Sequence, residues 1–164
     1  KGYWRNPEAT AAAFTEEGWY HTGDIGHLDD AGRLILSGRI KDIIVLPNGF
    51  NVYPEDLENA LRIAGIRDSV VLETKPGRIE AIVLAGTTPG ATPDPAAIRA
   101  RLDAAVKAAN GTLGPNQKIA AWRLWPQEDF PRTHTLKVKR TEVRAWADIE
   151  AALPVKEGGA TVVG

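Results

Sequence analysis

Residues 130–140 read Phe130-Pro-Arg-Thr-His-Thr-Leu-Lys-Val-Lys-Arg140. The pattern predicts a loop with two threonine hydroxyls that presents one lysine, Lys137, just before a helix. Taken alone, the stretch is only a basic surface. Together with two upstream segments, Tyr20-His-Thr-Gly-Asp24 and Gly38-Arg-Ile-Lys-Asp42, it indicates a set of nucleotide-binding groups. A carboxylate, an arginine and a lysine this far apart in sequence meet around one nucleotide only if the fold brings them together.

The composition is that of a globular protein, and it excludes several classes of function. The 20 Lys and Arg residues nearly balance the 21 Asp and Glu residues, so a nucleic acid or an anionic membrane is not expected as the main partner. The absence of cysteine excludes disulfides, thiolate metal sites and cysteine nucleophiles. No transmembrane segment or secretory signal is visible. We therefore expect a cytoplasmic protein, with peripheral attachment to a membrane left open.

The order of the sequence patterns predicts an α+β fold, in which helices and β-hairpins flank a mixed β-sheet. Helix starts are expected at Asn6-Pro7, Pro54 and Asp94-Pro95, because capping residues and proline favour the first turn. We expect residues 87–95 to form a loop and the tail from Pro154 to be loosely held. The expected helices span residues 7–14, 54–64, 95–110 and 138–147, and the expected strands span 24–29, 33–37, 42–46, 50–53, 69–73, 79–85 and 118–125.

Several common catalytic patterns are absent from the sequence. There is no Walker-type phosphate loop, no Gly-x-Gly-x-x-Gly motif and no Gly-x-Ser-x-Gly elbow. The three histidines, at positions 21, 27 and 134, lack metal-ligand spacing, so no metal site is expected. The five tryptophans, at positions 4, 19, 122, 125 and 146, are interpreted as core or inter-domain packing rather than as a ligand cage.

Four segments instead resemble motifs of the adenylate-forming (ANL) superfamily, which includes acyl-CoA synthetases, peptide-synthetase adenylation domains and luciferases. They occur in the family's order and at family-like separations over most of the chain. In sequence order they are Gly18-Trp-Tyr-His-Thr-Gly-Asp24, Gly38-Arg-Ile-Lys-Asp42, Asn48-Gly-Phe-Asn-Val-Tyr-Pro-Glu55 and Thr133-His-Thr-Leu-Lys-Val-Lys-Arg140.

The resemblance implies that Asp24 and Arg39 bind ATP. A carboxylate accepts hydrogen bonds from both hydroxyls of a ribose, and the guanidinium of Arg39 binds ribose or phosphate oxygens without losing its charge. Lys41 matches the hinge position between two domains. Without the neighbouring matches, the plainer interpretation is preferred for Asp24, an aspartate that closes a Thr-Gly turn, and for Arg39, a solvated residue at a strand end. The corresponding alternative for Lys41 is an exposed hairpin residue.

The resemblance also gives roles to residues of the other two segments, in adenylate formation and in transfer to CoA. By resemblance, Gly49 and Phe50 border the pantetheine tunnel of CoA, and Asn51 contacts the adenylate. Gly49 also fits the left-handed position of a Pro-Asn-Gly turn, and the two interpretations are compatible. Lys137 corresponds to the catalytic lysine of the family, although taken alone it is better interpreted as one member of a basic face with Lys139 and Arg140.

One position departs from the commonest family pattern. Leu136 stands where glycine usually precedes the lysine. Together with Leu46-Pro-Asn-Gly-Phe-Asn51, this departure is similar to the long-chain fatty acid–CoA ligase branch and hints at a fatty acid substrate.

The resemblance implies an AMP-forming acid–thiol ligase that uses ATP, Mg²⁺ and CoA. Residues 39–164 would form the small C-terminal lid domain, and residues 1–38 would be the trailing segment of the large N-terminal domain. The chain begins at Lys1 without methionine, so we expect a processed or excised piece that is inactive without the N-terminal domain. Three alternatives stay open: an enzyme that loads a carrier-protein phosphopantetheine or retains the adenylate, a non-catalytic module of the same fold, and a structural domain with chance matches.

Overall fold

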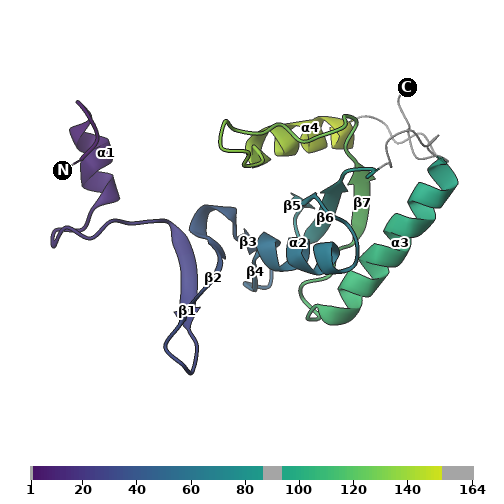
Figure 1. Ribbon diagram of the computed structural model, residues 1–164, viewed down its shortest axis with the longest axis horizontal. Coiled ribbons are helices and arrows are strands. Elements are labelled where there is room, and N and C mark those ends of the chain that lie inside the picture. The colour runs from purple at the N-terminus through teal and green to yellow at the C-terminus, as the bar shows by residue number, and fades with distance from the viewer. Residues whose placement is uncertain (1, 87–93, 153–164) are drawn as a thin grey trace. The chain divides into compact units, whose positions relative to one another are not determined.

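The computed structural model describes residues 2–86 and 94–152 (Figure 1). The chain divides into two compact units, residues 1–43 (unit 1) and 44–164 (unit 2). Most of the loop expected at residues 87–95 and the tail expected from Pro154 lie outside the described residues. The domain boundary expected between residues 38 and 39 stays a prediction.

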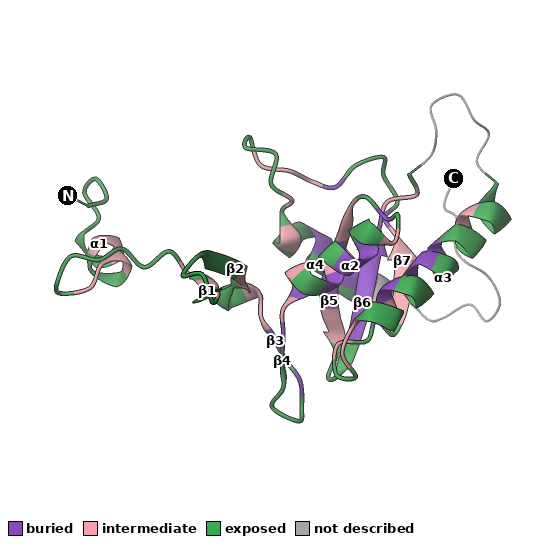
Figure 2. Cartoon of the chain, turned by 60° about the horizontal axis from the view of Figure 1, so that its bottom comes forward, coloured by how far each residue is buried: buried purple, intermediate pink, exposed green. Residues whose placement is uncertain are grey.

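Unit 1 contains one short helix and one β-hairpin. Helix α1 (Pro7–Ala13) begins as expected, because the Asn6 side chain accepts a 2.9 Å hydrogen bond from the backbone of Ala9. Strands β1 (Asp24–Leu28) and β2 (Leu34–Arg39) pair antiparallel. Figure 2 shows exposed and intermediate residues throughout this unit, and none of residues 2–43 is buried. The described part of unit 1 therefore has no hydrophobic core of its own.

Unit 2 is built around a mixed sheet of three strands, as the sequence predicted. The strand order is β5-β6-β7, with β6 antiparallel to β5 and parallel to β7. Between β6 and β7, the chain runs back through helix α3 to the end of the sheet at which β6 begins. Strand β7 can therefore pair parallel to β6. The elements are β3 (Ile44–Val45), β4 (Asn51–Val52), α2 (Pro54–Ile63), β5 (Ser69–Lys75), β6 (Arg78–Val83), α3 (Pro95–Thr112), β7 (Ala121–Leu124) and α4 (Arg140–Ala152).

Helices cover both faces of this sheet and enclose two clusters of buried side chains. Alternate residues of a strand point to opposite faces, so Val71 belongs to the cluster under α2 and α3, whereas Val70 and Leu72 belong to the cluster under α4. Leu57 and Leu61 of α2 are fully buried, and each such side chain contributes about 2 kcal/mol to folding. Figure 2 shows these buried residues on the sheet and on the inner sides of the helices.

Several elements differ in their bounds from the expected ones; α4, for example, was expected at 138–147 and spans Arg140–Ala152. Two of the differences have a clear structural cause. Helix α3 was expected to end at Asn110-Gly111 but continues to Thr112. The Asn110 side chain does not end the helix, because it donates to the carbonyl of Ile119 and accepts from the Ile119 backbone N–H, both at 2.9 Å. Strand β3 is shorter than expected, because a 3₁₀ turn, η1 (Ile40–Asp42), occupies the residues before it.

The tryptophans divide between the two units. Trp125 is buried in the cluster under α4 and packs edge-on against Trp146, with 5.0 Å between ring centroids. Trp122 packs against the other cluster. Trp4 and Trp19 are 86% and 75% exposed in unit 1, so they are not core residues of this chain, and inter-domain packing stays the prediction for them. None of the helices within the described ranges has the length and apolar character needed to cross a membrane.

Candidate functional site

Asp24 and Arg39 are direct partners across the β1–β2 hairpin of unit 1. Arg39 Nε lies 3.2 Å from Asp24 Oδ1, and Arg39 Nη2 donates to the carbonyl of Thr22 at 3.3 Å. The two side chains remain 38% and 46% exposed, respectively, so each keeps hydrogen-bonding groups open to a ligand. The structure thus brings together two residues that the resemblance assigned to ATP, Asp24 for the ribose and Arg39 for ribose or phosphate oxygens.

The turn before Asp24 is held by its own hydrogen bonds. Gly23 adopts a left-handed φ of +74°, a conformation that glycine tolerates without strain. The Asp24 backbone N–H donates to Thr22 Oγ1 at 3.0 Å, and the Ile40 N–H donates to the Gly23 carbonyl at 2.9 Å. These bonds fix the direction in which the Asp24 carboxylate leaves the strand.

Lys41, the expected hinge residue, lies in η1 and is exposed. The division between the two units follows Ile43, so Lys41 stands in the segment that joins them. Its position in a short 3₁₀ turn differs from the strand-like hairpin that the sequence suggested.

The turn between β3 and β4 presents Gly49, Phe50 and Asn51 at the surface of unit 2. Gly49 has a φ of +79°, and no atom lies within 4 Å of the place where a Cβ would be. The Asn48 side chain accepts a 3.0 Å hydrogen bond from the Phe50 backbone, which fixes the turn. Phe50 is 42% exposed and Asn51 is exposed. An extended ligand can therefore approach the backbone here closely.

Lys137 closes a tight turn before α4. Its carbonyl accepts from the Thr133 N–H at 2.8 Å, and its own N–H donates to Thr133 Oγ1 at 3.2 Å. The nearby Lys139 pairs with Glu142 at 2.8 Å. Within residues 2–86 and 94–152, no carboxylate lies within ion-pair distance of the Lys137 ammonium, which is exposed on a well-defined backbone.

Leu136 explains why a glycine suits this position. Its φ is +63°, in the left-handed region, where an L-residue with a side chain costs about 1 kcal/mol. The leucine side chain is 74% exposed, so packing does not offset that cost. The surrounding hydrogen bonds therefore hold the strained backbone.

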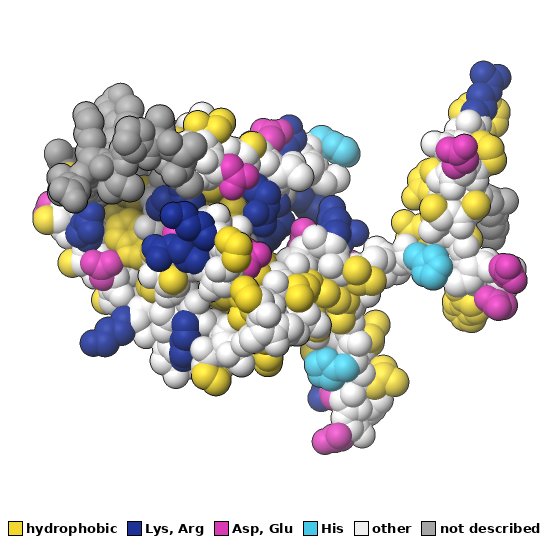
Figure 3. All heavy atoms as spheres, turned by 180° about the vertical axis from the view of Figure 1, so that it is seen from behind, with side chains coloured by type: hydrophobic (Ala, Val, Ile, Leu, Met, Phe, Trp, Pro, Cys, Tyr) yellow, Lys and Arg dark blue, Asp and Glu magenta, His cyan; other side chains and the backbone are white. Residues whose placement is uncertain are grey.

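The predicted site residues of unit 2 occupy two separate loops. Figures 1 and 2 both show the segment before α4 and the β3–β4 turn at different ends of this unit. Figure 3 shows Lys and Arg side chains on the visible face of the same unit, with Asp and Glu side chains among them. In the described part of the chain, no group of three or more His, Asp or Glu side chains is placed to hold a metal ion. No protein ligand for Mg²⁺ is assigned.

Three further residues that sequence reasoning did not single out support the Lys137 loop. Arg132 and Arg140 flank it, and each makes hydrogen bonds to acidic side chains distant in sequence. Glu58, the partner of Arg140, lies on the inner side of α2. The sequence does show an arginine on either side of Lys137. It does not show their acidic partners, which are 64 and 82 residues away.

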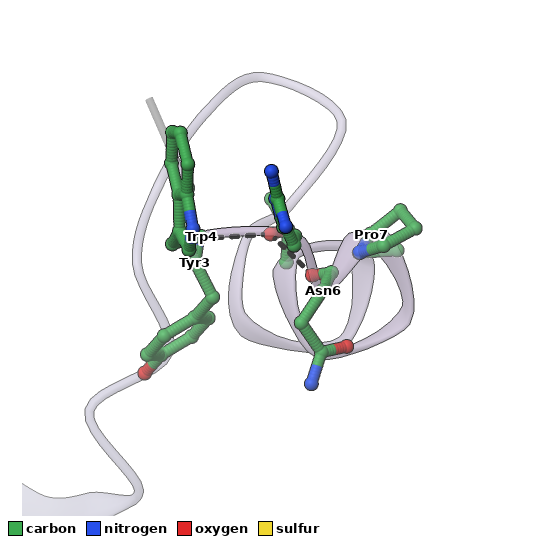
Figure 4. Close-up of a pocket in the computed structure, with 8 residues that line it drawn as sticks. Tyr3, Trp4, Asn6 and Pro7 are labelled. Atoms are coloured by element: carbon green, nitrogen blue, oxygen red, sulfur yellow. Dashed lines mark hydrogen bonds between the residues drawn. The ribbon is translucent and has the colours of Figure 1, made fainter.

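A shallow depression of about 590 Å³ lies at the start of unit 1 (Figure 4). It is lined by residues 2–7 with Thr10 and Ala11, and the Tyr3 backbone donates to Thr10 Oγ1 at 3.0 Å. It contains none of the predicted site residues. We assign it no chemical role.

Comparison with known proteins places these features in a family. The chain is 36% identical over 173 residues to the long-chain-fatty-acid–CoA ligase FadD15 of Mycobacterium tuberculosis, an alignment covering 92% of this chain and 29% of that protein. The amide bond synthetase McbA of Marinactinospora thermotolerans has a TM-score of 0.65 and 31% identity over 89% of this chain. ATP-bound MatB of Rhodopseudomonas palustris has a TM-score of 0.65 and 30% identity over 90% of this chain. No family model matches the sequence.

The chain spans less than a third of each of these three proteins, 29% of the ligase and 28% of each solved chain. It belongs to the adenylate-forming superfamily and corresponds to the C-terminal part of those enzymes. Within that superfamily its sequence resembles the long-chain-fatty-acid–CoA ligases. The predicted family and the predicted α+β fold class are confirmed.

Proposed function

We propose that the chain is the lysine-bearing lid of an AMP-forming ligase that activates a carboxylic acid, a fatty acid by sequence resemblance, and transfers it to CoA. The observation that carries this proposal is the Lys137 ammonium, which is exposed on a loop whose backbone is held by several hydrogen bonds. The Asp24–Arg39 pair supports it, because that pair offers the acceptor and donor groups that a ribose requires. The likeness to a CoA ligase and to an ATP-bound structure supports it independently.

In the first step, a carboxylate oxygen attacks the α-phosphorus of ATP. The bond from that phosphorus to the bridging oxygen breaks, and pyrophosphate leaves with the electron pair. Two anions must approach each other, so an ammonium group between them lowers the repulsion and stabilises the charge of the transition state. Lys137 supplies that group, and Asp24 and Arg39 hold the ribose of the same nucleotide.

In the second step, the thiolate sulfur of CoA attacks the acyl carbonyl carbon. The bond from that carbon to the phosphate oxygen breaks, which releases AMP and leaves the thioester. The surface formed by Gly49 and Phe50 borders the pantetheine arm, and Asn51 contacts the adenylate. Lys41 lies in the segment that would turn between the two steps. Mg²⁺ would arrive with the ATP phosphates and neutralise part of their charge.

Two other functions remain as alternatives to this proposal. An enzyme of the same superfamily can pass the acyl group to the phosphopantetheine of a carrier protein, and an assay that compares CoA with a carrier as acceptor distinguishes them. A non-catalytic module of the same fold tolerates replacement of Asp24 and Lys137. The resemblance assigns the acid pocket to the large N-terminal domain, so the fatty acid is proposed from the sequence relatives alone.

The test separates the two half-reactions in the full-length enzyme. Lys137→Ala should lower ATP–pyrophosphate exchange on the order of 100-fold or more and leave transfer from preformed acyl-adenylate nearly unchanged. Lys139→Ala is the matched control, because it removes a lysine of the same loop that is already paired with Glu142. Equal loss in both half-reactions would contradict the role given to Lys137. The 164-residue chain alone should show no pyrophosphate exchange.

A further inference from the structure

Arg132 is the most highly bonded side chain near the Lys137 loop. Its Nε and Nη2 atoms donate to the two carboxylate oxygens of Asp129 at 2.8 and 2.7 Å, a bidentate pair. Nη2 also lies 3.4 Å from Asp68 Oδ1, just before β5. The remaining nitrogen, Nη1, donates to the carbonyl of Leu136 at 3.2 Å. One guanidinium thus joins three separate segments of unit 2.

The Leu136 carbonyl belongs to the peptide group whose N–H is that of Lys137. This peptide also follows the residue with the left-handed φ of +63°. A backbone in that conformation persists only where its surroundings hold it. The hydrogen bond from Arg132 acts directly on this peptide, and therefore on the direction in which the Lys137 side chain leaves the loop.

Asp129, the acidic partner of Arg132, is anchored to the hydrophobic core. The Trp125 indole donates to the Asp129 carbonyl at 2.9 Å, and Trp125 and the neighbouring Phe130 are 8% and 3% exposed. Asp129 is therefore fixed in the backbone, and its carboxylate fixes the plane of the Arg132 guanidinium. A lysine at position 132 would keep the charge but could not make the same planar fork of bonds.

We propose that Arg132 is a positioning residue for Lys137, holding the Leu136–Lys137 peptide so that the ammonium is presented in one direction. Arg132 itself does not contact the reacting atoms. This inference rests on the proposed role of Lys137 in adenylate formation. It predicts that the loss of Arg132 acts through Lys137 and not through the fold.

The experiment uses the full-length enzyme with Arg132→Lys, Arg132→Ala, Lys137→Ala and the double variant Arg132→Ala/Lys137→Ala. Both Arg132 variants should lower pyrophosphate exchange by about 10- to 100-fold, because small displacements of a catalytic group are that costly. Transfer from preformed acyl-adenylate should change less than about twofold. The double variant should be no slower than Lys137→Ala, since residues that act as one unit are not additive.

A second measurement does not depend on activity. Amide hydrogen exchange at Leu136 and Lys137 should be about tenfold faster in Arg132→Lys, because the loop has lost an anchoring hydrogen bond. Arg144→Ala is the matched control. Arg144 is an exposed arginine of α4 that donates to the Glu73 carbonyl at 3.0 Å, and among the described residues it makes no hydrogen bond or ion pair with the loop at 132–137. It should leave this exchange and both half-reactions unchanged.

The outcomes separate this inference from the proposed function. If Lys137→Ala slows pyrophosphate exchange but Arg132→Lys and Arg132→Ala do not, the positioning role is wrong and the proposed function stands. A further loss in the double variant below Lys137→Ala would also overturn it, since Arg132 would then act independently. If Lys137→Ala itself leaves adenylate formation unchanged, the proposed function fails and the positioning role fails with it. Should Arg132→Ala unfold the protein, Arg132→Lys decides the question.

Discussion

The guanidinium of Arg140 lies 2.7 Å from the carboxylate of Glu58, which ties the first residue of α4 to α2. Both side chains also bind Val71 on the edge strand β5. Glu58 accepts from the Val71 N–H at 2.8 Å, and Arg140 donates to the Val71 carbonyl at 2.9 Å. The ion pair therefore satisfies backbone groups on an edge of the sheet that would otherwise be open to another strand. Burial raises the pKa of Glu58, and the charge of Arg140 opposes that rise.

Glu58→Ala should destabilise the protein by about 3 kcal/mol, because it leaves a partly buried arginine and a backbone N–H without a partner. Glu142→Ala is the control, since the Glu142–Lys139 pair is about half exposed and should contribute less than about 1 kcal/mol. Urea unfolding followed by circular dichroism measures both. Similar losses of unfolding free energy in the two variants would show that the Glu58–Arg140 pair stabilises the protein no more than an exposed ion pair does.

Leu136→Gly should leave the stability unchanged or raise it by up to about 1 kcal/mol. Glycine removes the strain of the left-handed φ, although it increases the entropy of the unfolded chain. His134→Gly, in the same loop but without a positive φ, has only the entropic effect and should lower stability by about 0.5–1 kcal/mol. The two melting temperatures provide the comparison. A larger loss for Leu136→Gly would mean that the leucine side chain stabilises the loop by a contact of its own.

The Asp129–Arg132 pair should make stability depend on pH in the acid range. Hydrogen bonds from the Arg132 side chain hold the pKa of Asp129 below its ordinary value of 3.8. Between the lowered and the ordinary pKa, the unfolded chain binds more protons than the folded one, so stability rises with pH. This contribution is fully present above the ordinary pKa and is lost as the pH falls through the lowered one.

Asp129→Asn should therefore flatten this part of the pH profile, measured by urea unfolding between about pH 2 and pH 6. The Asp129 side chain is 56% exposed, so solvent screening keeps the effect small. Glu128→Gln removes a neighbouring carboxylate without removing a bond to Arg132, and it should leave the slope unchanged. If stability in Asp129→Asn depends on pH as it does in the unchanged protein, the Asp129–Arg132 pair is not the cause of that dependence.

Asp24→Ala in the full-length enzyme should raise the KM for ATP by about tenfold or more, because it removes a charged acceptor for the ribose hydroxyls. Asp29→Ala is a close control. Asp29 pairs with Arg33 at 2.7 Å at the other end of the same hairpin, so its loss disturbs the hairpin without touching the proposed site. Steady-state kinetics with varied ATP distinguishes them. Equal changes in KM would indicate that Asp24 acts only on the hairpin.

Gly49→Leu should impair transfer to CoA more than adenylate formation. Gly32→Leu carries the same conformational cost, since Gly32 and Gly49 have φ values of +74° and +79° and open space around both. Only Gly49 lies on the surface proposed to border the pantetheine arm. The KM for CoA in the transfer half-reaction is the measurement. No difference between the two variants would remove that surface from the proposal.

Local signals in the sequence predicted most of the elements correctly. Asn6 and Asp94 cap helices through their own side chains, and Pro54 opens α2, because these interactions need only neighbouring residues. The Asn110-Gly111 signal failed because a distant partner, Ile119, binds the asparagine side chain. The failure has a tertiary cause that no local pattern contains.

For the candidate site too, the sequence indicated individual residues but not the tertiary contacts that hold them. The resemblance pointed to Asp24, Arg39 and Lys137 as candidates. The sequence predicted strands at 24–29 and 33–37, and the structure extends the second strand to Arg39, which it pairs with Asp24. The roles of Arg132 and Arg140 were not predictable, since each becomes specific only when α2, β5 and the loop before α4 pack together.

The parallel pairing of β6 and β7 also bears on the order in which the chain acquires its structure. Strands β5 and β6 are joined by a short turn, so that hairpin is able to close early. Strand β7 can reach the free edge of β6 only after the chain through α3 has folded back, and closing so long a loop is slow. The two hydrogen bonds between Asn110 and Ile119 hold the residues just before β7, so we expect this asparagine to influence the rate of refolding as well as the stability.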